Sequence, residues 1–175
     1  MEYEYPNAAN VYLNNLLIKD CSPVQGYGTL EAPIIVVTKV QNLHFSNSLI
    51  INNYSAGWFG FPAGLLYLLP RDNLFFYNNI VANNHTQGNT PCGAIELGGG
   101  SIVRIANSII YGNSQYQFIT ERNSHRETQV YISDSLIQGG TSPSILHVAS
   151  PVTHGIRFHW LDNIIDGPPM FLGDI

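Results

Sequence analysis

Apolar and polar residues alternate in short stretches that recur along the whole chain. Six eight-residue segments align without gaps, and each has apolar residues at its first, third, seventh and eighth positions. These core segments are 11–18, 43–50, 74–81, 103–110, 130–137 and 158–165. Apolar residues two positions apart predict half-buried strands, and no stretch of the chain has a convincing 3.6-residue helical period.

A second apolar stretch precedes every core segment after the first. These stretches are 33–37, 65–69, 94–97, 117–120 and 145–148. A single repeat cannot bury its own apolar side, whereas stacked repeats can pair strand on strand. The sequence therefore predicts an all-β, right-handed parallel β-helix (a solenoid) of about six coils. A propeller fits less well, because its blades need about 40–45 residues, and a leucine-rich array has too few strands per repeat.

The fifth position of every core segment is Asn or Asp. The column consists of Asn15, Asn47, Asn78, Asn107, Asp134 and Asp162. Both residue types tolerate left-handed backbone, which suits a bend between two strands. Because apolar columns flank this one, we expect its side chains to face the interior and to hydrogen-bond from coil to coil as a structural Asn ladder.

Composition and charge narrow the classes of function. The 175 residues suit one domain, only 11% of them are charged, and the net charge is −5. Nucleic-acid binding is disfavoured, because it needs a basic surface. No apolar run is long enough for a membrane span. Cys21 and Cys92 have no metal-ligand spacing, and we expect two free thiols, no metal and no cofactor.

Several motifs resemble right-handed parallel β-helix repeat proteins of the pectin-lyase-like superfamily, especially bacterial surface β-helix proteins. The motifs are the Asn column, residues 106–113, residues 92–96 (Cys-Gly-Ala-Ile-Glu) and the tail 162–171. The resemblance covers nearly the whole chain from Asn10 onward. It implies an extracellular or cell-surface location and a fragment of a longer exported protein. That superfamily includes polysaccharide lyases, glycoside hydrolases, phage tailspikes and adhesins.

The second position of the core segments faces outward if its neighbours face inward. All six residues of this column have planar side chains: Tyr12, His44, Phe75, Arg104, Tyr131 and His159. Planar groups at the strand spacing of about 4.8 Å form a plausible platform for sugar rings. The alternative is that aromatic residues simply favour strands.

A second outward set, on the other strand, consists of Tyr67, Glu96 and His147. A carboxylate beside a Tyr or His could abstract a proton, as a polysaccharide lyase requires, so these three are the catalytic candidates. Ordinary surface residues would give the same pattern. The superfamily's enzyme signatures are largely absent, since there is no Asp-rich calcium loop and no pair of carboxylates beside Thr153-His154-Gly155.

These observations favour a non-catalytic secreted or cell-surface module that binds a polysaccharide or a neighbouring macromolecule. The alternatives are a lyase or hydrolase fragment acting on acidic polysaccharide, and a spacer within a long stalk. We expect residues 1–175 to form one domain in which 166–175 cap the C-terminal end. Self-association through the open ends of the helix is a further expectation.

Overall fold

The fold comes from a computed structural model, which describes residues 9–22, 34–55, 63–86, 92–98, 100–114, 116–120, 126–142, 146–148 and 156–168. These residues form strands, turns and bends, and the described part of the chain contains no helix that could span a membrane. Every core segment supplies one strand to a single six-stranded sheet.

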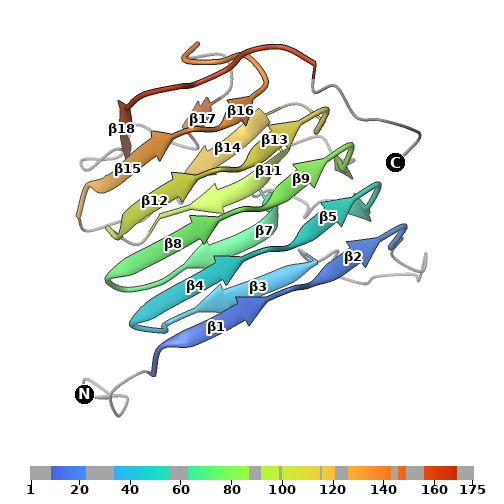
Figure 1. The fold of residues 1–175 in the computed structure, drawn as a ribbon. Coiled ribbons are helices and arrows are strands. Elements are labelled where there is room, and N and C mark those ends of the chain that lie inside the picture. The colour runs from blue at the N-terminus through green and yellow to red at the C-terminus, as the bar shows by residue number, and fades with distance from the viewer. Residues whose placement is uncertain are drawn as a thin grey trace.

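Three parallel sheets wind around a common core (Figure 1). Sheet A contains β1 (Val11–Asn14), β4 (Asn42–Ser46), β8 (Asn73–Tyr77), β12 (Ile102–Ala106), β15 (Thr128–Ser133) and β18 (Ile156–Trp160). Sheet B contains β2 (Leu17–Lys19), β5 (Leu49–Ile51), β9 (Ile80–Ala82), β13 (Ile109–Tyr111) and β16 (Leu136–Ile137). Sheet C contains β3 (Ile35–Thr38), β7 (Ala63–Leu69), β11 (Cys92–Leu97), β14 (Tyr116–Thr120) and β17 (Leu146–Val148). The short strands β6 (Tyr54–Ser55) and β10 (His85–Thr86) pair with each other.

The chain passes from sheet A to sheet B to sheet C and then begins the next turn. In Figure 1 the strands of sheet A run from left to right in front, those of sheet C return behind them, and the chain rises, which makes the winding right-handed. Each strand pairs in parallel with its equivalent in the next repeat, as Tyr12 does with His44 and Ile109 with Leu136. The predicted all-β parallel β-helix is confirmed.

Inward-facing side chains of the central strands are fully buried. Leu43, Phe45, Leu74, Phe76 and Val103 of sheet A each have 0% of their surface exposed. The equivalent residues in the first and last strands are only partly buried, because each lacks one neighbouring strand. The core is therefore continuous along the helix axis and thins at its two ends.

Two bends in each turn have left-handed backbone. The bend between sheets A and B contains Asn15, Asn47, Asn78, Asn107 and Asp134, with φ between 47° and 57°. The bend after sheet B contains Asp20, Asn52, Asn83, Gly112 and Gly139, with φ between 53° and 86°. The prediction that the fifth position of the core segments turns one strand into the next is confirmed for the first five segments.

The prediction that this column faces the interior is wrong. Asn15, Asn47, Asn78, Asn107, Asp134 and Asp162 are all exposed. Some of these side chains do bond along the column, because the Asn78 amide donates to Asn47 Oδ1 at 3.1 Å. A left-handed residue interrupts the alternation of a strand, so the residue after it faces the core instead.

The interior polar columns are formed by residues that follow the left-handed positions of the central turns. Ser48, Asn79, Ser108 and Ser135 are at most 3% exposed, and Asn53, Asn84 and Asn113 are at most 7% exposed. Asn84 Oδ1 accepts the Asn53 backbone N–H at 3.0 Å, and Asn113 Oδ1 accepts that of Asn84 at 3.1 Å. A structural Asn ladder therefore exists, but it consists of Asn53, Asn84 and Asn113.

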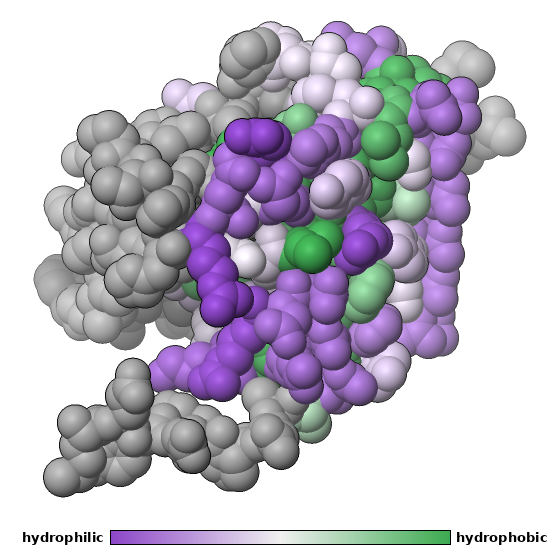
Figure 2. Space-filling model, turned by 90° about the vertical axis from the view of Figure 1, so that its left-hand side faces the viewer, coloured by the Kyte–Doolittle hydropathy of each residue, from purple (hydrophilic) through white to green (hydrophobic). Residues whose placement is uncertain are grey.

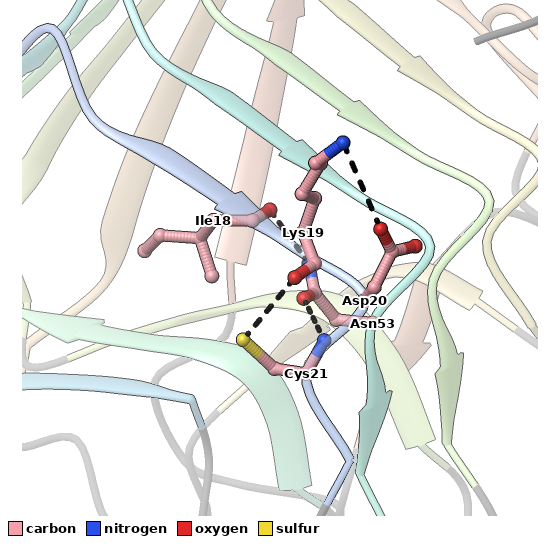
Figure 3. A network of polar contacts seen from close by, with 5 residues as sticks. All are labelled: Ile18, Lys19, Asp20, Cys21 and Asn53. Atoms are coloured by element: carbon pink, nitrogen blue, oxygen red, sulfur yellow. Dashed lines mark hydrogen bonds and ion pairs between the residues drawn. The ribbon is translucent and has the colours of Figure 1, made fainter.

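The ladder ends at Cys21 in the first repeat (Figure 3). The Cys21 backbone N–H donates to Asn53 Oδ1 at 3.0 Å, and the Asn53 amide donates to the Ile18 carbonyl at 3.0 Å. The Cys21 thiol is exposed and forms no disulfide. The side chain of Cys92 lies outside the described residues. So does most of the cap predicted for 166–175, because the structure describes only 166–168 of it.

The sixth core segment departs from the gapless alignment. Its left-handed residue is Asn163, with φ of 56°, rather than Asp162. The Asp134 N–H therefore donates to the Asp162 carbonyl, whereas the Asn78 N–H donates to Ala106, one position earlier in its segment. Ile165 takes the place beside Leu136 as a result. One extra residue in the last turn shifts the pattern by one position.

Candidate functional site

The outer face of sheet A carries the predicted stripe of planar side chains. Neighbouring strands place Tyr12, His44, Phe75, Arg104, Tyr131 and His159 next to one another in register. Tyr12 is 66% exposed, and the other five are partly exposed. The structure therefore brings all six residues into one column along the helix axis.

Ring faces within the stripe lie against each other. Ring centroids are 4.5 Å apart in the Tyr12–His44 and His44–Phe75 pairs, and the planes diverge by 13° and 16°. The Tyr131 and His159 rings are 4.4 Å apart and diverge by 9°. The Arg104 guanidinium lies 5.6 Å from the centre of the Phe75 ring, where it can make a cation–π contact.

This stacking changes how the stripe could contact a ligand. A ring covered on both faces, such as His44, offers only its edge to the solvent. The expected platform of open ring faces is therefore limited to the ends of the stacks. The edges still carry hydrogen-bonding groups, namely the phenol oxygens of Tyr12 and Tyr131 and the ring nitrogens of His44 and His159.

Amide side chains border the stripe on both sides. Asn42 donates to Asn10 and Asn73 donates to Asn42, each at 2.8 Å, on the side where the strands begin. Asn47 donates to Asn14 at 2.8 Å on the other side. A bond within the column uses one of the two N–H donors of an amide and leaves the other for a ligand, whereas Asn14 Oδ1 already accepts from both Asn47 and Ser46.

A chain of contacts between polar side chains continues the site beside the last two strands of sheet A. Arg157 pairs with Glu127 at 3.3 Å, and the Gln129 amide donates to the Glu127 carboxylate. Gln129 Oε1 lies 2.6 Å from His159 Nε2. A carboxylate only accepts hydrogen bonds, so Glu127 orients the Gln129 amide with its oxygen toward His159. The His159 ring is thus held both by Gln129 and by its stack on Tyr131.

Basic residues follow the edge at which the strands of sheet A begin, which we call the leading edge. In sheet A, the strands β4, β8, β15 and β18 each have one cation at or just before their start, and β12 has Arg104 at its centre, within the stripe. The five cations are Lys39, Arg71, Arg104, Arg126 and Arg157. All except Arg104 are exposed. The carboxylates described along the same edge are Asp72 and Glu127, and Glu127 is paired with Arg157.

Acidic residues gather on the other side of the molecule. Asp20, Asp134, Asp162 and Asp166 are exposed and lie at or near the two bends that flank sheet B. Figure 2 views the side of the molecule where the strands of sheet A begin, and its described surface is mainly hydrophilic. A chain with a net charge of −5 thus carries a row of cations along one edge.

Sequence reasoning missed this row, although a signal was present. Each core segment after the first has a Lys or Arg within the four residues before it or at its second position. Four of the five cations lie just before the eight-residue core segments, outside the repeated pattern. The row became visible once the strand register was known.

The catalytic candidates share one column of sheet C. Tyr67 pairs with Glu96, Glu96 with Ile119, and Ile119 with His147. Tyr67 is partly buried, Glu96 is 4% exposed and Ile119 is 0% exposed. Glu96 lies in the outward column, as expected, but the expectation that its carboxylate is accessible to solvent is wrong. The register separates it from His147 by the buried Ile119, and the His147 side chain is not among those described.

Neither a metal site nor a similarity to known proteins assigns a function to the described structure. Within the described part of the chain, no group of three or more His, Cys, Asp or Glu side chains is arranged to hold a metal ion. No protein-family model, curated protein or solved structure matches the chain. Function must therefore be argued from the outer face of sheet A and its chemistry.

Proposed function

We propose that the chain is a non-catalytic β-helix module that binds an acidic glycan along the outer face of sheet A. The row of one cation per strand beside the planar stripe carries the proposal. Successive strands are about 4.8 Å apart, so one cation recurs in each turn along the axis, although the cations lie at different distances from the stripe. A linear polymer with regularly spaced anionic groups matches such a repeat.

The chemistry of the face fits hydroxyl-rich ligands as well as charged ones. Asn10, Asn42 and Asn73 combine donors and acceptors, as sugar hydroxyl groups do. The Tyr and His edges of the stripe add further hydrogen-bonding groups between the two amide columns. Arginine suits carboxylate or sulfate groups, because its planar fork can donate two parallel hydrogen bonds.

Membership of the pectin-lyase-like superfamily and an exported, cell-surface location are parts of the same proposal. They are supported by the motif resemblance and by the parallel β-helix fold, which the superfamily shares. The enzyme alternative is weaker. Its carboxylate, Glu96, is 4% exposed, and its neighbour Ile119 is fully buried.

Affinity electrophoresis in gels containing an acidic or a neutral polysaccharide tests the proposal. The acidic polymer should retard the protein, and added salt should weaken this effect. The double substitution Arg71→Gln/Arg126→Gln should lower the affinity several-fold. Lys19→Gln removes an exposed cation beside sheet B and is the matched control. Equal retardation of the wild type, the double variant and the control would disprove the proposed site.

A second pair of variants tests the contribution of the stripe to glycan binding separately from that of the cations. Tyr12→Phe and Tyr131→Phe keep the stacked rings but remove the phenol hydroxyl groups. We expect each to weaken glycan binding by about 0.5–1.5 kcal/mol, the usual value of one hydrogen bond, with an unchanged melting temperature. Unchanged affinity in both variants would show that the stripe only stabilises the sheet.

A further inference from the structure

The two ends of the β-helix expose apolar side chains more than the central strands do. Among the described residues, the largest exposures of apolar residues are at Tyr12 (66%), Leu17 (63%) and Val36 (56%) in the first strands of the three sheets, and at Ile165 (58%) and Leu161 (53%) in the last turn. The inward residues of β1 and β18 are also only partly buried. Among the described residues, no strand pairs with the outer edge of β1 or of β18 in sheet A.

The residues at the two ends match one another column by column. The stripe ends in Tyr12 at one end and in His159 at the other, and Tyr–His stacks already occur twice within it, at 4.5 and 4.4 Å. The outer apolar column of sheet B runs from Leu17 to Ile165. In both columns, the residue at one end could therefore pack on the residue at the other end as its neighbours within the helix do.

The inward columns also match. Register with β15 and β4 would place Phe158 over Val11 and Trp160 over Leu13. The first buried polar column, Ser48 to Ser135, ends in Leu16 on one side and in Ile164 on the other, both partly buried. Apolar residues at these two positions leave neither end with a ladder side chain that requires a polar partner.

We propose that a second copy of this chain docks head to tail, with its last turn against β1 and β2 of the first. Parallel pairing of β18 with β1 continues sheet A across the junction, and His159 stacks on Tyr12. Ile165 packs beside Leu17. Such a contact joins two different surfaces, so it does not close on itself, and repeated association extends a rod along the helix axis. Head-to-head docking would oppose the strand directions and lose the column match.

Engineered disulfides test the docking register. Parallel neighbours are about 4.8 Å apart, within the usual range of about 4.4–6.8 Å between bridged Cα atoms. In a Cys21→Ser/Cys92→Ser background, the pair Leu17→Cys and Ile165→Cys should give a series of disulfide-linked oligomers on mild oxidation. Leu17→Cys alone can give dimers at most. Leu49→Cys with Ile109→Cys, central positions of the same column, is the control and should stay uncrosslinked.

The outcomes separate the alternatives. Oligomers beyond the dimer from the end pair alone support head-to-tail docking. No cross-linking of the end pair, or equal cross-linking of the central pair through side-by-side contact, would overturn it. Sedimentation velocity gives an independent readout: Leu17→Lys should abolish a concentration-dependent increase in mass, whereas Leu49→Lys should leave it in place. Neither measurement depends on glycan binding.

Discussion

At the scale of single residues, the bends decide which polar side chains enter the core. Each bend has a left-handed residue followed by a buried polar one, as in Asn83-Asn84 and Asn107-Ser108. The sequence shows both positions as polar and gives no direct sign of which one faces inward. The left-handed φ was predictable from residue type, whereas the burial of the following residue depends on how that φ redirects the chain.

Asn84 and Asn107 provide a test of this assignment. Asn84→Leu should lower the free energy of unfolding by about 1–3 kcal/mol, because it leaves the Asn53 N–H and the Ile50 carbonyl buried without their partner. Asn107→Gly should cost far less, since glycine adopts left-handed backbone freely. Asn107→Leu should cost about 1–2 kcal/mol through backbone strain alone. Urea unfolding followed by circular dichroism measures all three.

The order of these effects is decisive. If Asn107→Gly destabilised the protein as much as Asn84→Leu, the exposed column would be the one that supports the fold, as the sequence first suggested.

At the scale of elements, the sequence located the strands of sheets A and B well, because both lie within the aligned segments. It located the strands of sheet C only approximately. The central outward positions of sheet C were expected to be solvent-exposed, but Glu96 and Ile119 are buried. Alternation within a strand reveals its two sides but not whether the outer side is covered.

Glycine at the second bend gives a prediction at this scale. Gly112 has φ of +67°, and an added Cβ would lie 2.3 Å from Asn83 Oδ1 of the neighbouring turn. Gly112→Ala should therefore cost at least about 1 kcal/mol and lower the melting temperature by about 2–4 °C or more. Gly167→Ala is the matched control, because nothing lies within 4 Å of its added Cβ. Equal melting temperatures for the two variants would contradict the left-handed backbone at Gly112.

At the scale of the whole molecule, the repeat makes the structure nearly one-dimensional. Strand pairing in the described part of the chain joins each turn to the turns before and after it, so central turns have two paired neighbours and end turns have one. The same geometry turns a scattered set of basic residues into a row along the leading edge, and it sets Tyr12 and His159 at opposite ends of one column. The repeat spacing was sufficient to predict that the turns stack. It did not predict the one-residue offset of the last turn, which is seen in the pairing of Ile165 with Leu136.

Hydrogen exchange can test both the stack and its association. In dilute solution, the backbone amides of β8 and β12 should exchange much more slowly than those of β1 and β18, because strands at open ends unfold locally at lower cost. Raising the protein concentration should slow exchange in β1 and β18 and leave β8 and β12 unchanged, since head-to-tail docking gives each end strand a second neighbour. In Leu17→Lys this dependence on concentration should vanish. Uniform protection along sheet A at every concentration would mean that the ends are already closed within one molecule.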